Sequence, residues 1–456
     1  MKLQSIQILR GLAALLVVFY HTRAQELRSI AANGASEPSW LSGIVTNGFA
    51  GVDLFFVISG FIMVFVTTNQ PRGMRTAVDF LFARLTRVYP IWWFFAGITT
   101  IYIVGSHRLD GYGEGWPAFG HAEPVVPYVL KSFALLPQAD DPVLAVGWTL
   151  VHEVYFYLVF SLFLLASKKW WPALLLAWGI AVVAGSMFGL SGPRPVDLSA
   201  LVFFPMTMEF ILGAATGLIV TTGLAWRPGS ITLLSALGLC AALCIQGVET
   251  EHTLQWGRVL LYGIPCTGLI YGIVTLEMAD RMAWLVPAAI GCAVCIIVFQ
   301  LYGTVDTSPI ALRRGGTILA VSVGALAMLA TLWAGWLGGQ VRPQAIRALG
   351  PPLGAVKAWF VRIGDASYSL YLIHTIVIVA LRLVFHALGE IEPLAPVFRV
   401  GHPGLLDNVI YTLVCLGASI WLSLLSYNYV ERPMVRMFRT WRGKMFDASR
   451  RTPAPN

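Results

Sequence analysis

Twelve apolar runs, each long enough to cross a lipid bilayer as a helix, limit the fold of this chain more than any other feature. About 20 helical residues span the roughly 30 Å of hydrocarbon in a bilayer. The runs are continuously apolar, which predicts helices and not the alternating strands of a barrel. With 57% hydrophobic and 12% charged residues among 456, the chain is predicted to be an all-α, polytopic integral membrane helical bundle. We place the runs at residues 6–24, 44–68, 88–105, 147–166, 170–190, 199–222, 230–247, 256–277, 284–303, 315–338, 366–388 and 404–430.

The basic residues are distributed unevenly between the two ends of these runs. If the amino terminus is cytoplasmic, about twenty Lys and Arg residues lie on the inner side and about ten elsewhere outside the first run. This bias predicts a multi-pass protein with both termini in the cytoplasm, and it explains the net charge of +8 without a nucleic-acid partner. Arg313 and Arg314 fall on the outer side, so the ninth and tenth runs fit this scheme least well. The first run resembles a signal peptide but is long enough to span, and we assign it as a helix.

The six cysteines all lie inside apolar runs, and we interpret them as small core residues. Cys292 and Cys295 form a CxxC pair, but no second pair or nearby histidine accompanies them in the sequence. The sequence therefore predicts packing at these positions rather than a metal site.

Arg10 and His21 stand at opposite ends of the segment LRGLAALLVVFYH, and ionisable groups inside a span usually face an interior cavity. A separation of eleven residues is within about 20° of a whole number of helical turns and corresponds to a rise of roughly 16 Å. The side chains of Arg10 and His21 therefore lie on the same face of the helix. Asp53 and Glu153 enter their own spans from the same outer side as His21. A histidine supported by a carboxylate is a workable general base for a hydroxyl, so we expect His21 to act with Glu153 or Asp53. The alternatives are a histidine that snorkels to water and an ion pair that only fixes packing.

The segment FLFARLTRVYP places Arg84 and Arg87 three residues apart at the cytoplasmic start of a span. Side chains at i and i+3 point the same way on a helix, so two guanidinium groups can bind one polyanion. Positive-inside topology alone explains basic residues here, but not their continuation into the apolar sequence VYPIWWFF.

The eleventh run opens with GDASYSLYLIH, which places hydroxyls and an imidazole at the cytoplasmic entrance of a helix. These groups either satisfy the backbone and bond across helices or line a passage. They are Ser367, Tyr368, Ser369, Tyr371 and His374. Glu209 is a further carboxylate inside a span, and it is a secondary candidate because the sequence identifies no partner for it.

Two segments outside the runs have a distinctive composition. The loop 106–146 is acidic and rich in proline and glycine, and it serves either as a solvated connection or as a cover for a polar acceptor. The segment VRMFRTWRGKMF near the end mixes basic and apolar residues, which predicts a helix resting on anionic lipid rather than a catalytic element.

Taken together, these segments resemble the membrane-bound acyltransferase-3 family, whose members O-acylate bacterial surface and exported glycans. The matching motifs occur in the family's order from residue 5 to about 433. They are LRGLAALLVVFYH, GVDLFFVISGFIM, FLFARLTRVYP, GWTLVHEVYFYLVF, MEFILGAATG, DASYSLYLIH and YNYVERP. The resemblance implies a ten-helix core, to which this chain adds about two helices. We therefore divide it into core residues 1–279, an insertion at 280–357, core residues 358–433 and a basic cytoplasmic tail at 434–456.

The resemblance further implies an acyl donor, usually acetyl-coenzyme A, that approaches from the cytoplasm, and a glycan acceptor at the bacterial inner membrane. It implies catalytic roles for His21, Glu153 and Asp53. The residues that it implies for donor or substrate binding are Arg10, Arg84, Arg87, Trp148, Tyr368, Ser369 and His374. We expect direct transfer to a sugar hydroxyl, with a transient acyl-histidine as an open variant and acetyl not distinguished from succinyl.

A transporter or flippase without acyl-transfer chemistry is the alternative function, because many spans with intramembrane charges also suit alternating access. Against it, the sequence has no inverted repeat. Release of free thiol from labelled acetyl-coenzyme A distinguishes an enzyme from a carrier.

Overall fold

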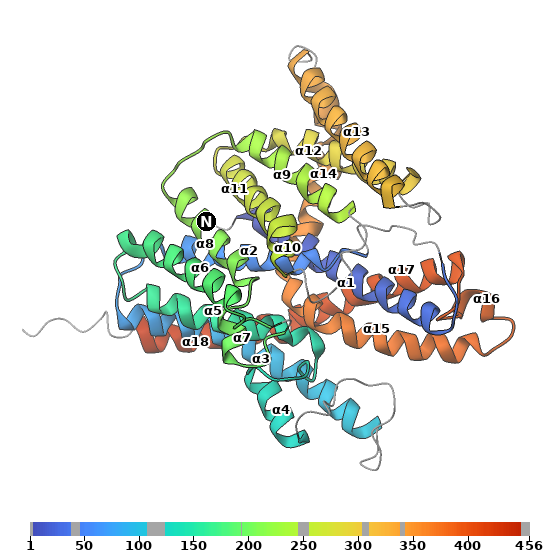
Figure 1. Cartoon of the computed structure of the whole chain (residues 1–456), viewed down its shortest axis with the longest axis horizontal. Coiled ribbons are helices and arrows are strands. Elements are labelled where there is room, and N and C mark those ends of the chain that lie inside the picture. Colours follow the sequence, from blue (N-terminus) through green and yellow to red (C-terminus); the bar gives the residue numbers. More distant parts are fainter. Residues whose placement is uncertain are drawn as a thin grey trace, which may run out of the picture.

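The computed structural model describes residues 3–37, 46–106, 124–192, 194–244, 255–302, 310–337 and 343–447. All regular secondary structure in these ranges is helical, which confirms the predicted all-α fold (Figure 1). The longer helices are α1 (Gln4–Ala32), α2 (Ala50–Thr67), α3 (Met74–Ser106), α4 (Val125–Ala134), α5 (Trp148–Phe163), α6 (Trp171–Met187), α8 (Thr207–Thr221), α9 (Pro228–Cys244), α11 (Ile264–Met278), α12 (Leu285–Tyr302), α13 (Ile310–Leu337), α14 (Pro343–Asp365), α15 (Ser367–Gly389), α17 (Leu405–Ser426) and α18 (Arg432–Asp447). Short helices are α7 (Leu198–Val202), α10 (Gln255–Arg258) and α16 (Ala395–Phe398).

Ten helical segments in the described part of the chain are long and apolar enough to cross a membrane. They correspond to ten of the twelve predicted runs. The other two runs also fall on helices: 88–105 lies inside α3, and 230–247 largely coincides with α9, a shorter apolar helix. The protein is therefore a multi-pass membrane protein, as the sequence predicts.

The two runs assigned to an insertion form α12 and α13, which pack against each other and against α9. In Figure 1, α13 extends away from the other helices. Cys240, Cys244 and Cys295 are buried together here, in contact with Phe299 and Ala320. All six cysteines are free thiols, and these three fill space between helices.

Close packing of α2 against α8 fixes the centre of the bundle. A Cβ atom added at Gly60 would lie 2.0 Å from the carbonyl oxygen of Phe210, and one added at Gly213 would lie 2.0 Å from that of Val57. Only glycine permits such close contact between backbones, the usual way in which membrane helices approach one another. On its other sides α2 contacts α1 and α5, and α3 packs on α5 and α15.

Two π-helical turns lie next to buried charged residues. The first, Val259–Gly263, directly follows Arg258, and the second, Tyr427–Glu431, joins α17 to α18 and ends at the buried Glu431. Such turns interrupt the regular hydrogen bonds of a helix and are frequent at functional sites.

Candidate active site

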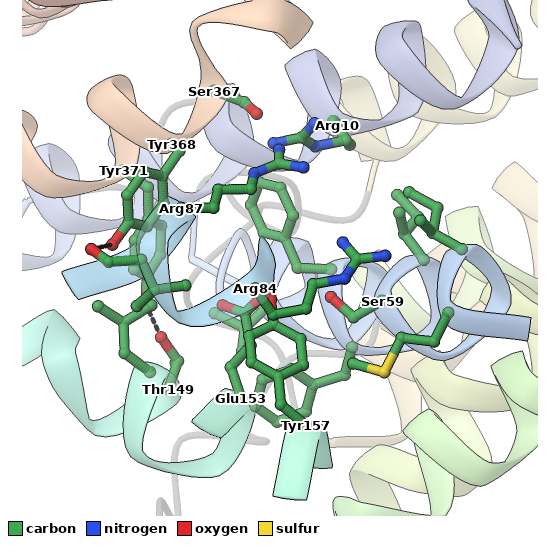
Figure 2. A pocket seen from close by; sticks show the side chains of 18 residues that line it. Arg10, Ser59, Arg84, Arg87, Thr149, Glu153, Tyr157, Ser367, Tyr368 and Tyr371 are labelled. Carbon is green, nitrogen blue, oxygen red and sulfur yellow. Dashed lines mark hydrogen bonds between the residues drawn. The ribbon is translucent and has the colours of Figure 1, made fainter. Parts of the chain in front are cut away.

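A pocket of about 90 Å³ lies between α1, α2, α3, α5 and α15 (Figure 2). Helix α2 contributes most of its apolar wall, and the other four helices contribute charged and polar groups. Five of the ten site residues selected from the sequence line this pocket. They are Arg10, Arg84, Arg87, Glu153 and Tyr368.

Three guanidinium groups and one carboxylate share this pocket. Arg10 comes from α1, Arg84 and Arg87 come from α3, and Glu153 comes from α5. Tyr157, one turn further along α5, donates a hydrogen bond to Glu153, and the Arg84 guanidinium lies 5.8 Å from the centre of the Tyr157 ring. Three positive charges against one negative charge give the described lining a net positive charge, which favours an anionic ligand.

The first turns of α15 form a polar end of the pocket. The Tyr371 hydroxyl lies 2.9 Å from Thr149 Oγ1 and donates a hydrogen bond to the carbonyl of Val146 at 3.1 Å. The Tyr368 hydroxyl donates to the carbonyl of Val88 at 2.9 Å. These bonds tie α15 to the start of α5 and to α3, so both tyrosine rings are held in place beside the arginines.

Ser369 belongs to a different contact, away from the pocket lining. Its hydroxyl donates a hydrogen bond of 2.6 Å to Glu431, a buried carboxylate that the electrostatic field of Arg10 and Arg87 also reaches. Glu431 belongs to the motif YNYVERP, but it is not among the site residues that the sequence predicts. A charged residue at the end of an apolar run is the sequence signal by which it could have been found.

His21 and His374 form a pair between α1 and α15. Nδ1 of His21 lies 3.1 Å from Nε2 of His374 and 2.9 Å from the carbonyl oxygen of Val17. Nδ1 of His374 lies 3.1 Å from the carbonyl oxygen of Leu370. A carbonyl oxygen only accepts hydrogen bonds, so the contacts favour the neutral tautomer with the proton on Nδ1 in both rings. The one Nδ1 proton of His21 is then shared between the carbonyl oxygen of Val17 and Nε2 of His374. Nε2 of His21 is then the unprotonated nitrogen.

Tyr371 connects the histidine pair with the pocket. Its side chain lines the pocket, and its ring centre lies 6.0 Å from the ring centre of His374. The described lining residues do not include His21, which is partly exposed, whereas His374 is fully buried. The arginines and the histidines are therefore neighbouring sites, with Tyr371 between them.

Neither carboxylate expected to support His21 is placed to do so. Both oxygens of the buried Asp53 bind Arg258, at 3.2 and 2.6 Å, and Glu209 lies next to them. Glu153 lies among the pocket arginines. The buried carboxylate of Asp53 is thus stabilised by a guanidinium group, and the carboxylate of Glu153 accepts a hydrogen bond from the Tyr157 hydroxyl. Position along a helix predicted depth in the membrane but not the direction in which each side chain points.

Trp148 does not line the pocket but packs behind a residue that does. It begins α5, and its ring packs edge-on against Phe56, which lines the pocket, at a centre-to-centre distance of 6.4 Å. Its other aromatic contact is His152, 5.8 Å away. Trp148 therefore shapes the site through Phe56. Within the described ranges, no cluster of three or more His, Cys, Asp or Glu could hold a metal ion.

Comparison with known proteins connects this site to a family. The family model described as an acyltransferase domain, of the acyltransferase-3 type, matches residues 3–428. The exopolysaccharide production protein ExoZ of Rhizobium meliloti is 30% identical over 248 residues, which cover 51% of this chain and 68% of ExoZ. The acyltransferase MdmB of Streptomyces mycarofaciens is 30% identical over 271 residues, or 54% of this chain and 64% of MdmB.

A third relative is the peptidoglycan O-acetyltransferase OatA of Listeria monocytogenes, 30% identical over 180 residues. That match covers 36% of this chain but only 25% of OatA. No solved structure matches this chain at a significant level.

Proposed function

The chain belongs to the acyltransferase-3 family, and from that premise we propose that it transfers an acetyl or similar acyl group from acyl-coenzyme A to a hydroxyl of an exported or surface glycan. Family membership makes it an acyltransferase, and the spans make it a membrane enzyme. The names of ExoZ and OatA, which refer to exopolysaccharide and peptidoglycan, support a glycan as the acceptor.

The observation that carries this proposal is the contact between His21 and His374. Nδ1 of His21 faces the carbonyl of Val17 and Nε2 of His374, and His374 presents Nε2 because its own Nδ1 faces the carbonyl of Leu370. Both acceptors favour a proton on Nδ1 of His21, and thus the tautomer with a basic Nε2. A general base needs such an unprotonated nitrogen. His374 thus takes the supporting role that the sequence analysis gave to Glu153 or Asp53.

In the proposed reaction, Nε2 of His21 takes the proton of the acceptor hydroxyl as its oxygen attacks the thioester carbonyl. The carbon–sulfur bond then breaks, and the thiolate recovers the proton from the imidazolium. The products are an O-acyl ester and free coenzyme A, so atoms and charges balance.

At the other end of the site, Arg10, Arg84 and Arg87 bind the phosphates of the donor. Glu153 with Tyr157 limits the repulsion between these cations, and Tyr368 holds α15 against α3. The ion pair between Asp53 of α2 and Arg258 of α10 stabilises the packing of these two helices. The pantetheine arm extends from the arginines past Tyr371 toward His21, with Arg10 on the same face of α1 as His21.

For the orientation, we propose that the arginine end faces the cytoplasm of a bacterium, where acyl-coenzyme A is made, and that the protein lies in the inner membrane with both termini inside. The excess of basic residues on that side supports this arrangement.

The direct test is acyl transfer by the purified protein. Incubation with radiolabelled acetyl-coenzyme A and glycan fractions should release free thiol and give labelled glycan. The His21→Ala variant should lose about 10²- to 10⁴-fold in rate, the usual contribution of a general base. Transfer near the wild-type rate in that variant would remove His21 from the mechanism, and absence of thiol release by the wild-type protein would favour a carrier.

A further inference from the structure

A second pocket, of about 210 Å³, opens on the other side of the two arginines of α3. Arg84 and Arg87 line both this pocket and the pocket at the candidate active site. The second pocket also contains Arg442 of α18 and Gln70, which precedes α3. No carboxylate occurs among the described residues that line it. Three guanidinium groups therefore surround a cavity that leads to the arginines of the active site.

Helix α18 packs against α3. From the sequence alone, this segment is predicted to rest on lipid. Arg442 forms a bidentate pair with Asp79 of α3, at 2.5 and 2.7 Å. Arg75 donates a hydrogen bond to the carbonyl of Phe446, and the ring of Phe446 lies 6.1 Å from that of Phe82. These contacts hold the guanidinium of Arg442 at the edge of the pocket.

The family match ends at residue 428, before α18 begins at Arg432. The family assignment therefore says nothing about this helix. Its position and charge have to be interpreted from the chain itself.

We propose that Arg442 is a fourth phosphate-binding residue of the donor site, beside Arg10, Arg84 and Arg87, and that α18 forms one wall of the entrance to it. The ligand chemistry that fits is a cluster of phosphate groups on an organic molecule, because three forked guanidinium groups around one cavity match the geometry of phosphate oxygens. The nucleotide end of coenzyme A has this chemistry, so the inference rests on the proposed donor.

The pair with Asp79 gives Arg442 a fixed position. A long arginine side chain loses considerable rotational freedom when it is held in place for a ligand. The carboxylate of Asp79 already holds it, and the bidentate geometry sets the plane of the guanidinium. Asp79 is therefore a positioning residue, and Arg442 is the residue that contacts the phosphate.

The test is a binding titration of the purified full-length protein with coenzyme A and, separately, with pantetheine, which has no phosphate groups. Arg442→Gln should raise the Kd of coenzyme A by about 10- to 100-fold, the range for a hydrogen bond to a charged group, and leave pantetheine binding unchanged. The Kd of coenzyme A for Arg442→Lys should lie between those of the wild-type protein and Arg442→Gln, because lysine retains the charge but loses the forked geometry.

Arg439→Gln is the matched control, since it removes the same charge from an exposed position on α18. We expect a change of no more than about twofold in the Kd of coenzyme A for this variant. Equal weakening of coenzyme A and pantetheine binding by Arg442→Gln would mean that Arg442 acts only through the fold, and would overturn the inference. An unchanged Kd in Arg442→Gln would overturn it as well. If the wild-type protein fails to bind coenzyme A, the proposed donor is wrong, which is a separate and recognisable result.

Discussion

Replacing His374 with leucine removes the nitrogen that lies 3.1 Å from Nδ1 of His21 and leaves an apolar side chain of similar size in a buried position. The change tests whether His374 holds the tautomer of His21 or performs the proton transfer itself. His374→Gln is the companion variant, because the glutamine amide can place an acceptor oxygen close to the position of the lost nitrogen.

The magnitude follows from the contacts that remain. Nδ1 of His21 keeps the carbonyl of Val17 at 2.9 Å, so its proton still has an acceptor after the substitution. The loss is therefore close to that of one neutral hydrogen bond, about 0.5–1.5 kcal/mol, or roughly 2- to 13-fold in rate. We expect this loss in kcat, with an unchanged KM for the donor, because the arginines proposed to bind its phosphates lie on α1 and α3. His374→Gln should recover part of the rate.

The assay measures initial rates of acyl transfer at several donor concentrations for the wild-type protein, His21→Ala, His374→Leu and His374→Gln. A thermal unfolding midpoint for each purified variant controls for the fold. A loss in His374→Leu as large as that in His21→Ala would refute the assignment and indicate that His374 is the base. An unchanged kcat would show that the contact between the two rings has no part in catalysis.

Two further predictions concern the arginines. Arg87→Ala should raise the KM for acetyl-coenzyme A at least tenfold with a smaller change in kcat, because it removes a charged group from both pockets; an unchanged KM in steady-state assays would reassign this arginine to membrane topology. Arg258→Gln should leave Asp53 buried without its cation and cost about 3–5 kcal/mol of stability, seen as a lower thermal midpoint, whereas Asp53→Asn with Arg258→Gln should recover part of that loss. Additive losses in the double variant would contradict the pairing.

The sequence predicts the helices well because the bilayer imposes a simple rule on them. A continuous apolar run of about 20 residues has few alternatives to a membrane helix, and the twelve runs all fall on helices. Residues 245–247 of the run 230–247 lie outside the described residues, and the rest of that run falls on α9. The acidic part of the loop 106–146, with Asp110, Glu114 and Glu123, lies outside the described residues, so its proposed relation to the acceptor stays a prediction.

The site is predicted less completely, because the sequence gives depth within the membrane but not the rotation of one helix against another. The shared face of Arg10 and His21 follows from helical geometry alone. The partner of His21 depends on how α15 packs against α1, and no periodicity within one helix contains that information. The sequence therefore predicts a passage residue at His374, whereas the structure places its ring against that of His21.

The position of Arg442 next to α3 could not be predicted from the sequence for a related reason. A basic, amphipathic segment at the end of a membrane protein is usually a helix on lipid. Its contact with Asp79 depends on the path of the chain through the π-helical turn Tyr427–Glu431, which the sequence does not reveal.

The most direct test is a structure of the protein with a non-transferable thioether analogue of acetyl-coenzyme A. We expect to find the phosphates among Arg10, Arg84, Arg87 and Arg442 and the pantetheine arm beside Tyr371. The acyl carbon should lie where a hydroxyl bound to Nε2 of His21 can reach it. An acyl group that lies among the arginines, with Tyr371 between it and His21, would contradict the proposed mechanism.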